Sequence, residues 1–151
     1  MSFFGDVFGG KAAMQAANYN AKIMERNAKI KDQEAEQIMS VHNNYNLPKF
    51  DKTIEAIHGQ TRVAYLTSGV TMSGTPLEAM YANELELQTD RDIMTYNAEN
   101  ARDQKENEAI QMRADADLAR WRGKVAKKAS YYAAGQSLLT TATSLKTAGY
   151  I

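Results

Sequence analysis

The sequence contains no cysteine, only two prolines in 151 residues and no long apolar run. The absence of cysteine excludes disulfide bonds, thiol chemistry and zinc sites of the cysteine type. No uninterrupted apolar run approaches the roughly 20 residues that one helix needs to cross a bilayer. The N-terminus has no basic region ahead of its apolar residues, so we expect no secretory signal. Prolines are few, and large core-forming side chains are also few. The chain therefore fits an extended helical protein better than a compact globule.

Acidic residues are missing from one part of the chain. None follows Asp117, whereas six basic residues do, and between Glu78 and Asp117 eleven acidic side chains accompany four basic ones. The pattern suits a solvated helix face with cations at its C-terminal end. The same pattern also occurs in surfaces that bind an acidic partner or nucleic acid, and we expect any DNA contact to be non-specific at most.

The clearest local pattern is a turn at residues 68–75, with a helix expected on each side. Gly69 suits the left-handed position just past a helix end. Thr75 and Glu78 have the spacing of a capping box, and Pro76 is tolerated at the first helical position. We expect this turn to dock on a neighbouring molecule through Gly69, Val70, Gly74, Thr75 and Pro76.

Small residues recur at three- and four-residue spacing on both sides of the turn, as in the seam of a coiled coil. Aligning the two sides against the turn predicts an antiparallel hairpin in which Ala28 lies opposite Ala116 and Ala21 opposite Gly123. The fold class is therefore predicted to be all-α, a long antiparallel coiled-coil-like hairpin over residues 11–130. The predicted seam comprises Ala17, Ala21, Met24, Ala28, Lys31, Ala35 and Ile38, then Phe50, Ile54, Ile57, Thr61 and Ala64. On the returning helix it comprises Met80, Leu87, Ile93, Ala109, Met112, Ala116, Ala119, Gly123 and Ala126.

Pro48 interrupts the first side of the hairpin, and a kink or a new helix start is expected there. The only histidines, His42 and His58, have no carboxylate pair at metal-ligand spacing, so both are interpreted as ordinary residues of the helix surface. No combination of nucleophile, base and oxyanion donor is evident. We therefore expect no enzyme activity, no cofactor and no metal.

The two ends carry most of the large apolar side chains. Residues 1–10 form an apolar arm followed by a Gly-Gly hinge, and residues 131–151 form an apolar tail that is either a short last helix or a helix extension. Such segments must be buried against something, and basic residues beside apolar ones suit a protein groove or a membrane surface. The expected contact residues are Phe3, Phe4, Val7, Phe8, Trp121, Leu138 and Leu139.

Three stretches of the sequence, the turn among them, resemble a known family of proteins. The run from Arg62 to Leu77, an acidic helix around Tyr96-Asn97-Ala98 and a small-residue stretch from Ala133 to Leu139 resemble internal virion proteins of short-tailed bacteriophages. The resemblance implies a core or ejection protein, packaged inside the capsid near the portal, which leaves ahead of the DNA and helps to build a conduit through the host envelope. It implies several copies in contact with portal or core proteins, and it transfers no catalytic residue.

Three other interpretations stay open at this point. A structural adaptor or tail-associated component would remain in the mature particle. A secretion-apparatus coiled coil fits the composition but not the turn. A small enzyme would need a pocket with converging polar groups, which a long hairpin seldom forms.

Overall fold

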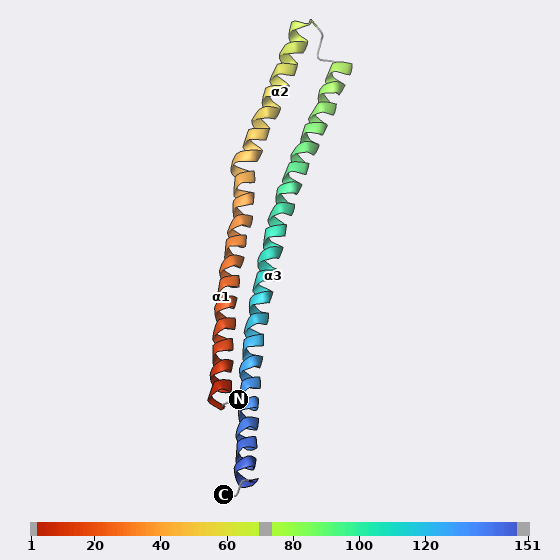
Figure 1. The fold of residues 1–151 in the computed structure, drawn as a ribbon. Helices are drawn as coiled ribbons and strands as arrows, with labels where there is room; N and C mark the ends of the chain where they lie inside the picture. The colour runs from red at the N-terminus through yellow and green to blue at the C-terminus, as the bar shows by residue number, and fades with distance from the viewer. Residues whose placement is uncertain (1–2, 70–73, 148–151) are drawn as a thin grey trace. The chain divides into compact units, whose positions relative to one another are not determined.

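The computed structural model describes residues 3–69 and 74–147, with side chains from residue 5. In chain order the elements are α1 (Phe3–Val41), the π-helix η1 (His42–Asn46), α2 (Leu47–Thr67) and α3 (Thr75–Thr147) (Figure 1). No strand occurs in these described ranges. Unit 1 joins the start of α1 to the end of α3, and unit 2 comprises residues 32–106. The predicted all-α class, with antiparallel helices in each unit, is confirmed.

In unit 1, residues 3–31 of α1 lie beside the part of α3 that begins at residue 107 (Figure 1). The two helices pack through small side chains. The residues that are fully buried recur every seven positions on each helix, as the packing of antiparallel helices requires. Alanine and glycine at these positions let the two backbones approach closely, but they bury little apolar area. These residues are Ala21 and Ala28 on α1, and Ala109, Ala116 and Gly123 on α3.

The register of unit 1 differs from the predicted register by about one helical turn. A Cβ atom built on Gly123 would lie 2.6 Å from the Cβ of Ala17, so Gly123 faces Ala17 and not Ala21. Lys31 correspondingly reaches Glu108, at 3.4 Å, and not Met112. The prediction was wrong because a seam of small residues offers several nearly equivalent registers. Ala126, expected in the seam, is exposed, and Lys127 is half-buried in its place.

Unit 2 contains the interruption expected at Pro48, in the form of a π-helical turn. The Leu47 amide donates to the His42 carbonyl, five residues back, and the backbone stays right-handed through the segment. Proline lacks an amide hydrogen, and its ring would meet the carbonyl of Asn44 in a regular α-helix. The wider turn moves that carbonyl away from the ring, so α1 passes into α2 without a loop.

The extra residue of the π-helix changes which side chains face α3. His42 and Leu47 both face α3 and are five residues apart, which is longer than the usual spacing of three or four in an α-helix. Counting on from Leu47 in a regular helix brings His58 and Tyr65 to the side that faces α3, and both are half-buried. The interpretation of His58 as a surface residue was therefore wrong. Ile57 and Ala64 were predicted in the seam but are exposed, and so is Ile93. The half-buried seam residues of α2 that agree with the prediction are Phe50, Ile54 and Thr61.

The turn between α2 and α3 has glycine where the backbone requires it. Gly69 has φ +70° and follows Ser68, whose amide donates to the Ala64 carbonyl, so Gly69 ends α2 as predicted. Gly74 has φ +71° and its carbonyl accepts from the amides of Leu77 and Glu78. Gly74 therefore stands at the start of α3, one position before Thr75, which the capping-box spacing had placed there.

The ends of unit 1 are helical. α1 begins at Phe3 and continues through Gly9 and Gly10, where the sequence suggests a hinge. A Cβ on Gly10 would collide with the side chain of Ser130, so this glycine permits close packing and not bending. The tail is an extension of α3 to Thr147, and every described residue after Ser137 is exposed.

Candidate functional site: a histidine groove and a basic surface

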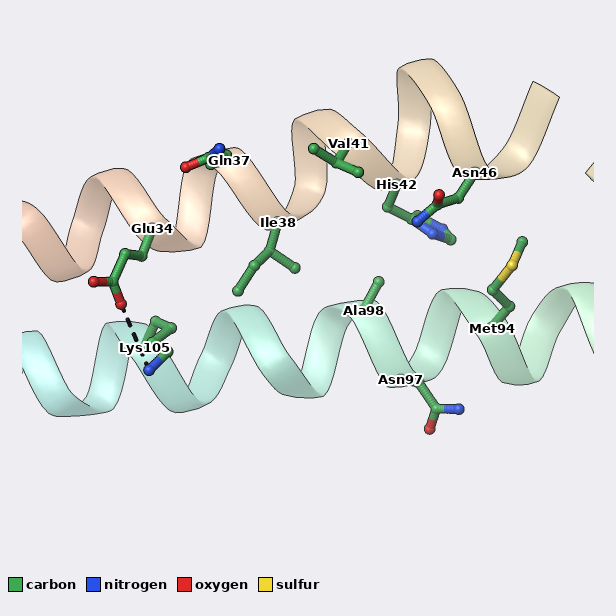
Figure 2. A pocket seen from close by; sticks show the side chains of 10 residues that line it. All are labelled: Glu34, Gln37, Ile38, Val41, His42, Asn46, Met94, Asn97, Ala98 and Lys105. Atoms are coloured by element: carbon green, nitrogen blue, oxygen red, sulfur yellow. Dashed lines mark ion pairs between the residues drawn. The ribbon is translucent and has the colours of Figure 1, made fainter. Parts of the chain in front are cut away.

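The largest fully buried side chain described is His42, at 1% exposure. It stands seven residues after the buried Ala35, so it occupies a seam position and not the helix surface. The interpretation of His42 as an ordinary surface residue was wrong. The turn of η1 directs its ring toward α3 (Figure 2). There, Nε2 of the ring lies within hydrogen-bond distance of the Thr95 hydroxyl.

The hydrogen bonds of Thr95 assign the tautomer of His42. The Thr95 hydroxyl donates to the Arg91 carbonyl at 3.0 Å, so its hydrogen is already used. Nε2 of His42, 3.2 Å from the Thr95 oxygen, must therefore be the donor in that contact. In the neutral ring Nδ1 then carries the lone pair, and it is buried without a hydrogen-bond partner among the described residues.

A groove of about 650 Å³ lies beside His42, between the end of α1 and α3 (Figure 2). Its walls are mainly apolar, with Ile38 and Ala98 on facing helices. At one end an ion pair joins Glu34 to Lys105 at 3.5 Å. The groove therefore offers mainly apolar contact to a ligand.

Unit 1 carries a second candidate surface, which is basic and aromatic. A cavity of about 440 Å³ is lined by Trp121, Val125, Tyr131 and three lysines of α3, together with Met14 of α1. Nζ of Lys127 lies 5.9 Å from the centre of the Tyr131 ring, within range of a cation–π interaction. Lys124 and Lys128 are exposed, and neither has an ion-pair partner within the part of the chain that the structure describes.

Arg120 belongs to the same basic segment but has a structural role. It pairs with Glu25 of α1, and it also bonds Asp117 on its own helix at 3.0 Å. The hydrogen bond that it donates to Glu25, reinforced by the bond to Asp117, raises the pKa of Arg120 above its usual value. Arg120 thus links the two helices of unit 1 and leaves the neighbouring lysines to face outward.

The contact residues predicted at the ends are largely accessible where their side chains are described. Phe8 is 67% exposed and Val7 is half-buried, while the side chains of Phe3 and Phe4 lie outside the described residues. Trp121, Leu138 and Leu139 are all exposed, at 61%, 51% and 70%. Of the predicted turn residues, Val70 lies outside the described residues, Pro76 is half-buried, and Gly69, Gly74 and Thr75 are exposed.

His42 and Thr95 are the residues that sequence reasoning missed. The sequence does hold a trace of them, since His42 continues the seven-residue spacing of Ala21, Ala28 and Ala35. Their pairing depends on the register between α1 and α3, which that spacing leaves open.

No group of three or more histidine or acidic residues that could hold a metal occurs among the described residues. No helix in the described part of the chain has both the length and the apolarity to span a membrane.

No protein-family model matches the chain, and no curated protein or solved structure is significantly similar to it.

Proposed function

We propose that the protein is a non-enzymatic internal virion protein of a bacteriophage, packaged in several copies near the portal and taking part in genome ejection through the host envelope. The observation that carries the proposal is the contrast between the seam and the surface. The fully buried apolar side chains described are all alanines, whereas 23 large apolar side chains are exposed. A protein with this distribution needs other molecules to cover its surface.

The internal virion proteins that the turn resembles work in such assemblies, in contact with portal and core proteins. Exposed apolar residues at the ends of unit 1, such as Phe8 and Leu139, suit burial against such neighbours. The alternative is an adaptor or tail-associated component that stays in the particle. It would use the same surfaces but would remain after the DNA has left.

Quantitative mass spectrometry of particles before and after DNA release tests the proposal. We expect this chain to disappear from emptied particles together with the genome, while the portal and capsid proteins remain. Retention at full copy number would favour the adaptor. Absence from intact particles would overturn both functions.

A second test concerns the ends as contact surfaces. Phe8→Ser combined with Leu139→Ser should reduce co-purification with the other core proteins, because both side chains are more than half exposed. Tyr45→Ser, at 62% exposure and away from both ends of the chain, is the matched control. Helicity should not change in either variant. Unchanged co-purification of the double variant would move the contact surface to the flank or the turn.

A further inference from the structure

We propose that the basic surface of unit 1 docks on an acidic stripe of unit 2 in a second copy of this chain. The basic stripe is defined as Trp121, Lys124, Val125 and Lys128, and the acidic stripe as Tyr81, Glu84, Leu85 and Asp92. The inference rests on the proposed function for the presence of several copies in one place. It adds the surfaces through which they meet.

The basic stripe lies on one face of α3. Its positions recur at spacings of three, four and seven residues, which places them side by side on a helix. Trp121 is 61% and Val125 43% exposed, so apolar area is open to a partner. Their positive neighbours, Lys124 and Lys128, stay unpaired within the described residues.

The acidic stripe repeats this arrangement with the opposite charge. Tyr81 is 65% and Leu85 68% exposed, and these two residues line a shallow hollow of about 280 Å³ with Glu84 and Gln88. Asp92 lies one helical turn beyond Gln88 on the same face. Neither Glu84 nor Asp92 has an ion-pair partner in the described ranges.

The two stripes match in the arrangement of their apolar side chains and are opposite in charge. Each places an aromatic ring and a branched aliphatic side chain, four residues apart, beside charges of one sign. The net charge of the whole chain is zero, so copies do not repel one another overall. Charge complementarity selects this pairing over contacts between like stripes, in which charges of one sign would oppose each other.

Two different surfaces meet in one contact, so each chain can use its other stripe either reciprocally within a dimer or on a further copy in a ring or filament. Each stripe is short, so one contact falls in the size class below about 1,200 Å² that is typical of transient complexes. We therefore expect a salt-sensitive association that thiol crosslinking can capture.

Crosslinking between two separately purified chains tests the contact, since the native sequence has no cysteine. A Leu85→Cys chain mixed with a Val125→Cys chain, at low ionic strength and with a flexible thiol–thiol crosslinker, should give a mixed dimer. Val63→Cys, at a site 59% exposed on α2, replaces Val125→Cys in the control mixture. The yield should exceed that of the control about tenfold or more, and it should fall as salt shortens the Debye length.

Charge reversal then decides whether the stripes recognise each other. Lys124→Glu/Lys128→Glu in the Val125→Cys chain, or Glu84→Lys/Asp92→Lys in the Leu85→Cys chain, should each lower the yield about tenfold or more. Mixing the two reversed chains should restore it, because the charges are again complementary. Lys22→Glu/Lys29→Glu, which reverses exposed cations elsewhere in unit 1, should leave it unchanged. Circular dichroism verifies the helicity of every variant.

A yield no higher than the Val63→Cys control would overturn the proposal. So would a yield that survives either reversal, or reversed chains that fail to restore it. These results concern purified chains only. They are independent of particle composition, so failure here is distinguishable from failure of the proposed function.

Discussion

The two units hold α3 against its partner helix in different ways. Unit 1 uses alanine and glycine at seven-residue spacing, with ion pairs such as Lys31–Glu108 at the edges. Unit 2 places a polar pair, His42 and Thr95, inside the seam, next to a π-helical turn. A small-residue seam permits close approach but distinguishes poorly between registers, whereas a directional hydrogen bond forms in only one. The comparison indicates that unit 1 provides close packing of the helices, whereas unit 2 fixes the register between them.

The largest expected effect is overpacking of the seam of unit 1. Ala116→Leu adds a branched side chain where the residue is 0% exposed, between helices brought close by alanine. We expect a loss of about 3 kcal/mol in the free energy of unfolding, the upper part of the usual range for overpacked cores. Denaturant unfolding followed by circular dichroism measures it. Ala126→Leu, on the exposed face that the sequence wrongly assigned to the seam, should change stability little.

Loss of the polar pair in unit 2 should rank second. Thr95→Val keeps the shape but removes the acceptor for Nε2 of His42, leaving a buried donor unsatisfied. The expected cost is about 1–3 kcal/mol, and replacing both partners, with His42→Leu added, should recover part of it. A double-mutant cycle in denaturant measures the coupling. Additive losses would show that the hydrogen bond does not stabilise unit 2.

Gly123 tests the close approach with the smallest possible change. Gly123→Ala places a Cβ 2.6 Å from that of Ala17, and the resulting strain should outweigh the helix propensity gained, for a net loss of about 1 kcal/mol. Gly135→Ala is the matched control, because no atom lies within 4 Å of a Cβ added there. It should stabilise by a few tenths to about 1 kcal/mol. Thermal unfolding of both variants should therefore shift in opposite directions.

The smallest expected effect concerns the exposed ion pair of unit 2. Asp51 and Arg91 are 3.0 Å apart, but their side chains are 47% and 42% exposed. Asp51→Asn should cost only about 0.2–1 kcal/mol, and less at high salt, because water and ions screen the pair. Unfolding at two salt concentrations checks this. A loss of stability as large as that of Thr95→Val would mean that ion pairs, and not the buried histidine, determine the helix register in unit 2.

The sequence by itself determined the helices, the turn and most of the seam. Glycines 69 and 74 adopt positive φ because the chain must reverse there, and seven-residue spacing follows from helical geometry alone. These features depend only on residues within a few positions of one another along the chain, so they can be predicted from the sequence. Trp121, Leu138 and Leu139 are exposed, and their role as contact residues stays a prediction.

Only the tertiary structure decided the register and its consequences. Ala17 faces Gly123, and His42 hydrogen-bonds to Thr95. Both contacts follow from the register between the two antiparallel helices, and the spacing of small residues is compatible with several registers. The π-helix before Pro48 then turns His58 inward and Ile57 outward, although the spacing of a regular helix predicted the reverse. Local spacing cannot fix either result, because each depends on how residues from distant parts of the chain fit against one another.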